Sequence, residues 1–123
     1  MRHVTQHPSL PLCGHACLAM VLGLKLDEAI DKMGHKRTTR TRELVAALGK
    51  RAKDRRLIPV RQRAIPEFAV MKVTWKGRPQ RGHFAIHQHG YVHDPLLPGK
   101  MTRHDWDLWV GDRGRVTSAL ELQ

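Results

Sequence analysis

The chain has 123 residues, of which 22 are Lys or Arg and 11 are Asp or Glu, so its formal net charge is +11. Domains typically run about 100–150 residues, and the length therefore predicts one domain over residues 1–123. A hydrophobic content of 41% favours a folded protein over a disordered chain. No apolar run approaches the ~20 residues of a membrane span, and the first residues lack the apolar stretch of a secretory signal, so we expect a cytoplasmic protein without membrane contact.

The excess positive charge lies in one segment. Residues 1–35 and 82–123 carry net charges of 0 and −1, whereas residues 36–81 carry +12. This segment has three interpretations: a solvated face, a docking surface for an acidic substrate or protein, and a contact for nucleic acid. The aromatic content of 5% serves base stacking poorly, and no nucleic-acid-binding motif is present. The cations that would share one face of a helix and its continuation are Arg42, Lys50, Lys53 and Arg56.

Helices are expected in the first half of the chain. Residues 13–22 are apolar nearly all round, which is typical of a buried helix. Residues 26–33 are amphipathic and predict a second helix. Thr39 or Thr41 is expected to cap a third helix over residues 42–53.

Strands are expected to follow the helices. Residues that are β-branched, aromatic or alternating in polarity predict strands at 57–60, 68–75, 83–88, 91–94 and 116–122. His89 and Gly90 predict a hairpin turn, and Thr102 is expected to cap a last helix over residues 103–110. Helices followed mostly by strands indicate an α+β fold with an antiparallel sheet rather than a parallel α/β fold.

Cys13 and Cys17 stand four residues apart in the first expected helix. At helical spacing their Cβ atoms would lie ~5–6 Å apart, whereas a disulfide needs roughly 3.5–4.5 Å, so we expect free thiols and a reducing compartment. Cys13 would begin the helix, where free backbone N–H groups and the positive end of the helix dipole stabilise a thiolate. Gly14 leaves space where a substrate carbonyl would approach. Cys17 is expected to be an ordinary buried residue.

His83 and Asp94 flank the expected hairpin turn. A cysteine nucleophile needs an imidazole as base and a third group that orients the imidazole. With the hairpin centred between Gln88 and His89, residues 83 and 94 would face each other on one side of the sheet, whereas a shift of one residue would separate them. Gln6 carries an amide that can donate to an oxyanion beside the N–H group of the nucleophile.

Four blocks of sequence together resemble a known family. The blocks are Gln6 with Cys13-Gly14-His15-Ala16-Cys17-Leu18-Ala19-Met20, then Gly82-His83-Phe84-Ala85-Ile86, then Tyr91-Val92-His93-Asp94-Pro95, and last Trp106 with Trp109-Val110-Gly111. They resemble the papain-like cysteine peptidases of the C39 type, the bacteriocin-leader or double-glycine peptidase family. The resemblance spans nearly the whole chain. It implies a papain-like α+β fold, with the cysteine at the start of a helix and the histidine and aspartate on an antiparallel sheet.

The resemblance also implies roles for particular residues. The catalytic residues would be Cys13, His83, Asp94 and Gln6, and the substrate-binding residues would be Gly14 and Gly82. The cysteine would attack, the histidine would act as base and acid, the aspartate would orient the histidine, and the glutamine would hold the oxyanion with the cysteine N–H. The implied reaction is hydrolysis of a peptide or isopeptide bond in a peptide or protein, without a cofactor or a metal.

Other functions stay open at this point. The same three residue types serve amidases, deamidases, transglutaminases and deconjugating enzymes. A basic nucleic-acid-binding protein and an inactive papain-like module that binds a protein are the alternatives from other classes. The nine histidines suggest zinc, but His83 and His87 would lie ~13 Å apart on a strand, and no cysteine or carboxylate completes a ligand set around His87 and His89.

Overall fold

The computed structural model describes residues 1–7 and 9–123, with the side chains of these residues apart from 79–81. In this part of the chain the helices are α1 (Cys13–Leu22), α2 (Leu26–Met33), α3 (Thr41–Leu48), the 3-10 turn η1 (Gly49–Arg51) and α4 (Arg103–Val110). The strands are β1 (Ile58–Pro59), β2 (Phe68–Trp75), β3 (Arg78–Gln88), β4 (Tyr91–His93), β5 (Met101–Thr102) and β6 (Gly114–Glu121). The predicted α+β class is confirmed, with α4 inserted between the last two strands.

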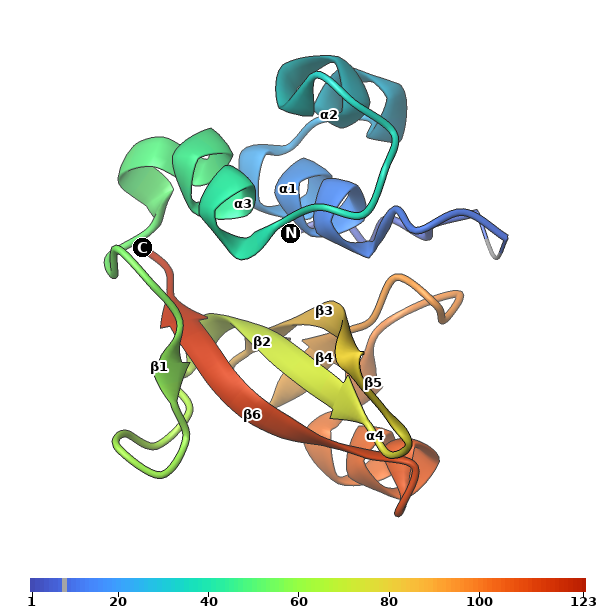
Figure 1. The fold of residues 1–123 in the computed structure, drawn as a ribbon, viewed down its shortest axis with the longest axis vertical. Helices are drawn as coiled ribbons and strands as arrows, with labels where there is room; N and C mark the ends of the chain where they lie inside the picture. Colours follow the sequence, from blue (N-terminus) through green and yellow to red (C-terminus); the bar gives the residue numbers. More distant parts are fainter. Residues whose placement is uncertain (8) are drawn as a thin grey trace.

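The strands form one antiparallel sheet in the order β1-β6-β2-β3-β4-β5. Figure 1 shows α1, α2 and α3 grouped on one side of this sheet and α4 on the other. Each side has its own apolar core. Leu18 of α1 packs with Val70 and Ile86 on the first side, and Met71 packs with Trp106 of α4 on the second. The sheet therefore lies between two layers of helix, and residues that alternate along a strand enter different cores.

The helix α1 has the predicted bounds, and its surroundings explain its composition. Its residues from Gly14 to Val21 are all buried, so an apolar side chain is favoured on every face. The helix ends because Gly23 adopts a left-handed conformation with φ of 69°. Glycine takes this conformation without the steric cost that a Cβ atom adds. The first helix is therefore a central, fully covered element with Cys13 as its first residue.

The helix α3 differs from its prediction at both ends. Neither Thr39 nor Thr41 caps it; instead Glu43 Oε1 accepts the backbone N–H of Arg40 at 2.9 Å. The cause is burial, because Thr39 packs against α1 and is unavailable as a cap. The helix ends at Leu48 rather than at residue 53, and η1 follows. The expected single face of basic residues therefore does not form, since Lys50, Lys53 and Arg56 lie beyond the helix.

Four of the five predicted strands are present with altered ends, and β2 has the predicted bounds. β3 starts at Arg78, β1 is reduced to two residues, β4 stops at His93, and β6 runs from Gly114 to Glu121. The two-residue strand β5 was not predicted, because two residues are too short to show a period. The helix α4 matches its prediction, and Thr102 Oγ1 accepts the N–H of Asp105 at 3.1 Å as an N-cap.

The hairpin of β3 and β4 has the predicted turn but a different register. Gln88 pairs with Tyr91, so the two-residue turn is His89-Gly90, with φ values of 47° and 86°. Both values are positive, as a type I′ turn requires. The hairpin is centred between His89 and Gly90, one residue further along than the centre that would place residues 83 and 94 opposite each other. The residue opposite His83 is therefore displaced by two positions, which is one full period of a strand. Residues 83 and 94 consequently stay on the same face of the sheet.

Candidate active site

A cleft of about 680 Å³ opens where the start of α1 meets the beginning of β3. Gln6, Cys13 and His83 all line it. Asp94 lies behind His83 and is fully buried. The structure therefore brings together the four side chains to which the sequence assigned catalytic roles, although His83 lies 77 positions after Gln6 in the sequence.

Cys13 occupies the N-terminal position of α1. Its side chain is partly exposed, while the thiol of Cys17 one turn further is buried, and both thiols are free. Leu12 is the N-cap of α1 and gives no side-chain hydrogen bond, so the cap leaves the first backbone donors of the helix unoccupied. The N–H of Cys13 has no intrahelical partner because it belongs to the first helical residue. The sulfur and this N–H therefore share the positively polarised end of a helix that faces the cleft.

His83 is held by a buried carboxylate. Its Nε2 donates to Asp94 Oδ1 at 2.7 Å, and Trp106 Nε1 donates to Asp94 Oδ2 at 3.0 Å. The backbone N–H of Leu96 donates to Oδ1 at 2.9 Å. Since Asp94 occupies Nε2, the nitrogen of His83 that remains for Cys13 is Nδ1. The carboxylate thus fixes both the tautomer and the orientation of the ring.

The environment favours charge on both members of this pair. Burial alone lowers the pKa of His83, but hydrogen bonds to Asp94 and Cys13, together with their charges, raise it to about 9. Burial alone raises the pKa of Asp94, but the hydrogen bonds from His83, Trp106 and Leu96 hold it below its ordinary value. At neutral pH the pair is therefore an imidazolium and a carboxylate. Burial raises the pKa of the Cys17 thiol well above its ordinary value, which keeps that thiol protonated.

Gln6 lies at the rim of this arrangement and is 8% exposed. Its backbone N–H donates to the carbonyl of Pro95 at 2.9 Å, which ties the N-terminal segment to the loop after Asp94. Its side-chain Nε2 donates one hydrogen to the carbonyl of Leu10 at 2.9 Å. An amide nitrogen carries two hydrogens, so the second remains for a group in the cleft.

The two glycines expected in the substrate site lie in different surroundings. Gly82 lines the cleft. Gly14 is buried, and a Cβ atom there would come within 2.7 Å of Thr39 Cβ. The space that Gly14 leaves open is therefore filled by Thr39 rather than by the cleft. His15 beside it is also buried; its Nε2 donates to the carbonyl of His35 at 2.7 Å, and this contact holds the segment before α3 against α1.

Two tryptophans contribute to the site in ways that the sequence did not reveal. Trp106 was recognised only as part of a family pattern, yet it donates to the orienting carboxylate. Trp75 lines the cleft and stacks on His83 with ring centroids 5.7 Å apart. Nothing local marks either contact, because Trp75 and Trp106 reach the site from β2 and α4. The pairing of β2 with β3 would have been needed to place Trp75.

The remaining histidines do not form a metal centre in the described part of the chain, where no group of three or more potential ligands occurs. His87 is buried and Nδ1 donates to the carbonyl of Pro66 at 2.9 Å. His93 is buried and stacks on His3, and burial and nearby cations lower the pKa of His93 to about 4. Of the three histidines around the hairpin, His87 and His93 are buried, whereas His89, in the turn, is exposed.

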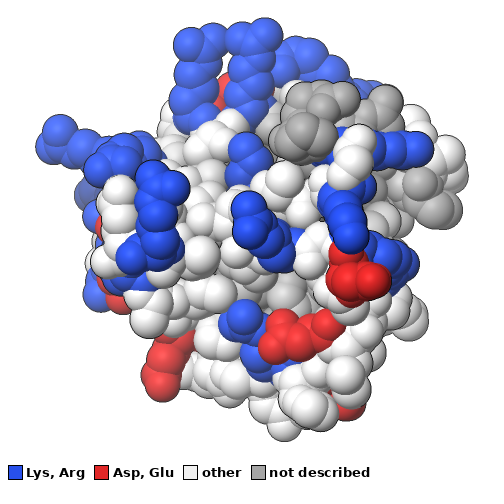
Figure 2. All heavy atoms as spheres, turned by 60° about the horizontal axis from the view of Figure 1, so that its bottom comes forward, with Lys and Arg blue, Asp and Glu red and all other residues white. Residues whose placement is uncertain are grey.

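Several cations of the basic segment, residues 36–81, form ion pairs with nearby acidic side chains. Ion pairs within it join Arg37 to Glu43 and Arg63 to Asp54, and a third joins Lys53 to Glu121 at the end of β6. Figure 2 shows Lys and Arg in separate groups over one face, with uncharged surface between them. None of the helices in the described ranges is long and apolar enough to cross a membrane.

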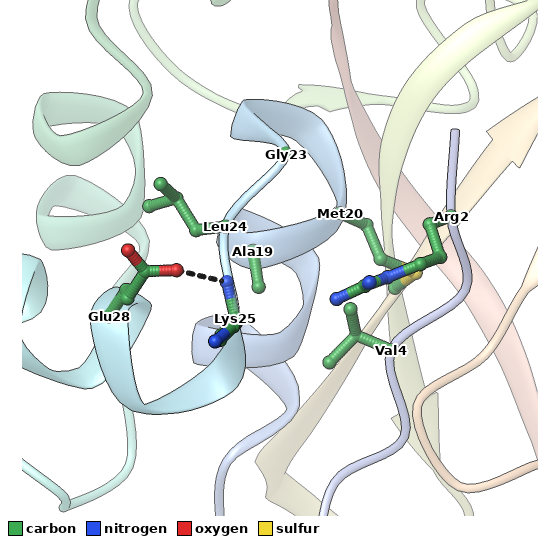
Figure 3. A pocket seen from close by; sticks show the side chains of 8 residues that line it. All are labelled: Arg2, Val4, Ala19, Met20, Gly23, Leu24, Lys25 and Glu28. Atoms are coloured by element: carbon green, nitrogen blue, oxygen red, sulfur yellow. Dashed lines mark hydrogen bonds between the residues drawn. The ribbon is translucent and has the colours of Figure 1, made fainter.

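A second hollow, of about 330 Å³, lies between the N-terminal segment and the junction of α1 and α2. Figure 3 shows Arg2 and Val4 on the N-terminal segment at one side and Lys25 and Glu28 at the other, with Ala19 of α1 between them. The Glu28 carboxylate accepts a hydrogen bond from the backbone N–H of Lys25 at 2.8 Å, and this contact caps the start of α2. The lining includes no cysteine or histidine, so this hollow lacks a nucleophile and a base of the kind that the cleft contains.

Comparison of the chain with protein-family models, with curated proteins and with solved structures found no match.

Proposed function

We propose that the protein is a cysteine-dependent hydrolase that cleaves a peptide or isopeptide bond, with the papain-like arrangement of the C39 peptidases. The observation that carries the proposal is that Cys13 and His83 line the same cleft, with His83 hydrogen-bonded to the buried Asp94 at 2.7 Å. A cysteine at a helix start, an imidazole whose far nitrogen is held by a carboxylate, and an open cleft are the parts that nucleophilic acyl transfer needs. The α+β layout, with the cysteine on α1 and the histidine on the sheet, supports the same family.

The proposed reaction begins with the Cys13 thiolate. Its sulfur attacks the substrate carbonyl carbon and forms a C–S bond, while the carbonyl oxygen becomes an oxyanion. The N–H of Cys13 and the free hydrogen of Gln6 Nε2 donate to this oxygen. His83 Nδ1–H then gives its proton to the leaving nitrogen, the C–N bond breaks, and an amine departs. A thioester and a neutral imidazole remain.

The second half of the reaction restores the enzyme. His83 Nδ1 takes a proton from a water molecule, whose oxygen attacks the thioester carbonyl carbon. The C–S bond breaks, the carboxylic acid departs, and the imidazolium and the thiolate are regenerated. Asp94 keeps its charge throughout and stabilises the imidazolium whenever His83 is protonated.

Thiol reactivity tests the proposal without a known substrate. Iodoacetamide alkylates thiolates, and a thiol with an ordinary pKa is only about 1% ionised near pH 6.5. We expect Cys13 to react at least about tenfold faster than Cys17 at this pH, as measured by peptide mapping, because an imidazolium beside it stabilises the thiolate. His83→Ala should remove most of this advantage, whereas the matched variant His104→Gln, on the exposed surface of α4, should not. Slow and equal labelling of the two cysteines would contradict the proposal.

Hydrolysis itself is tested with a random peptide library. The wild-type protein should generate new amino termini, detected by mass spectrometry, and Cys13→Ser should generate none. Rapid alkylation of Cys13 without cleavage of either this library or peptides joined by a lysine isopeptide bond would show a reactive thiol that hydrolyses neither bond, and would overturn the proposal in favour of another acyl-transfer reaction.

A nucleic-acid-binding function is the alternative from another class, and no structural observation favours it over the hydrolase. The helix that would have presented four cations on one face ends at Leu48. The ion pairs of Arg37, Lys53 and Arg63 with acidic partners also reduce the charge that this segment offers to phosphates.

A further inference from the structure

The described charged side chains that line the cleft beside Cys13 are all basic. Arg78, at the start of β3, is among its lining residues. None of the described lining residues is acidic, and neither Pro8 nor residues 79–81 include an acid in the sequence. The acidic side chain of the site, Asp94, is fully buried and already accepts three hydrogen bonds. The cleft therefore presents cations to a ligand without a competing carboxylate on its wall.

A second cation lies against the same wall. Lys72 is half-buried on β2, the neighbour of β3, and a Cβ atom at Gly82 would come within 2.5 Å of Lys72 Cε. The Lys72 side chain therefore lies across Gly82, a residue that lines the cleft. The absence of a side chain at Gly82 is what makes room for it. Glycine at position 82 therefore leaves room for the Lys72 side chain and also keeps the cleft open.

These two cations also lack the partners that neutralise others. In the described part of the chain, four Lys or Arg side chains form ion pairs with acids, namely Arg37, Lys53, Arg63 and Arg103. Neither Lys72 nor Arg78 is among them. A cation on the wall of a cleft that has no acidic partner attracts an anionic group of a ligand.

On the basis of the proposed function, we infer that the substrate is a peptide with an Asp or Glu side chain within one or two residues of the bond that Cys13 attacks. Arg78 and Lys72 donate hydrogen bonds to the carboxylate of that side chain. A cleft of about 680 Å³ lies within the usual ~300–1,000 Å³ of ligand sites and accepts more than the scissile bond alone. This charge preference is local to the cleft and is distinct from the general basicity of residues 36–81.

Alkylation by two reagents of similar size tests the inference. Iodoacetate is an anion and iodoacetamide is neutral, and both form an S–C bond to Cys13 with loss of iodide. The ratio of their rate constants reports the electrostatic preference of the cleft. The imidazolium of His83 also attracts iodoacetate, so the diagnostic quantity is the change in the ratio between variants. Arg78→Gln and Lys72→Met should each lower the ratio about fivefold, the effect of one charge near 4 Å in a water-like medium.

The matched control is Arg61→Gln, which removes one guanidinium beside β1. That strand lies at the far edge of the sheet from β3, so the ratio should not change. High salt should lower the wild-type ratio, and should lower the ratio of Arg78→Gln by a smaller factor because one cation fewer is screened. If both cleft variants keep the wild-type ratio, the inference is wrong while the hydrolase proposal stands. If Cys13 reacts slowly with both reagents, the hydrolase proposal itself fails.

The peptide library gives an independent measurement on real substrates. Acidic residues should be enriched near the cleavage point for the wild-type protein and for Arg61→Gln, and the enrichment should decline in Arg78→Gln. Cleavage without any acidic preference in the wild-type protein would overturn the inference and leave the proposed reaction intact.

Discussion

Replacing Asp94 with Asn tests whether a single buried carboxylate keeps His83 charged. The pKa of His83 is about 9 in the folded protein, compared with an ordinary value of 6.5. A difference of this size corresponds to about 3 kcal/mol in favour of the imidazolium. Burial alone lowers the pKa of His83, and without the charge of Asp94 only Cys13 opposes this effect, so we expect His83 to titrate well below pH 9. Proton NMR of the imidazole ring measures this titration directly.

The same change alters how stability depends on pH. Because His83 binds its proton more tightly when folded, its contribution to stability is fully present below about pH 6.5 and is lost as the pH rises through about 9. In this window the unfolding free energy of the wild-type protein should fall by about 3 kcal/mol on account of His83. In Asp94→Asn this fall should become much smaller, because only Cys13 still raises the pKa of His83. Urea unfolding at several pH values measures the difference between the two proteins, in which contributions from other groups largely cancel.

Cys13→Ala is the control, since it removes the thiol and keeps the carboxylate. The pKa of His83 should decrease only partly in this variant, because Asp94 raises it more than Cys13 does. A His83 titration that stays near pH 9 in Asp94→Asn would refute the reasoning, and would mean that the carboxylate orients the ring without determining its charge.

Two further changes test the support of the site. Trp106→Phe removes the N–H donor to Asp94 Oδ2 and keeps most of the ring, so it should lower the unfolding free energy by roughly 1.5–3 kcal/mol, measured by urea unfolding. An unchanged stability would show that water replaces the indole. Gly14→Ala places a Cβ atom 2.7 Å from Thr39 Cβ and should cost about 1–3 kcal/mol in the same assay. The matched variant Gly99→Ala, with no neighbouring atom within 4 Å, should cost far less; equal costs would contradict the packing explanation.

The regular parts of the fold could be predicted because their causes are local. The helix α1 is apolar on all faces and ends at a glycine, and α4 starts at a threonine cap, so both have the predicted bounds. The start of α3 was mispredicted because its cap is a glutamate inside the helix, while Thr39 is buried by α1. That competition depends on a tertiary contact, and the sequence near α3 does not show it.

The site was predictable in its residue types and less so in its geometry. The choice of Cys13, His83 and Asp94 followed from the chemistry of a nucleophile, a base and an orienting group. Their approach depends on the hairpin register, which differed from the one considered but kept the same face. The contributions of Trp75 and Trp106 depend on strand order and on the packing of α4, which no local pattern encodes.

The attachment of the N-terminal segment has a consequence for when the candidate site is completed during folding. Gln6 is bonded to Pro95, and His3 Nε2 donates to the carbonyl of Leu97 at 2.7 Å, across 94 positions of sequence. Contacts of such long range form late, because the loop-closure entropy must be paid before they contribute. A ribosome must therefore deliver both strands of the hairpin before the first residues of the chain find their places. Cys13 is synthesised early, but the pair of His83 and Asp94 takes its place beside the thiol only when folding is nearly finished.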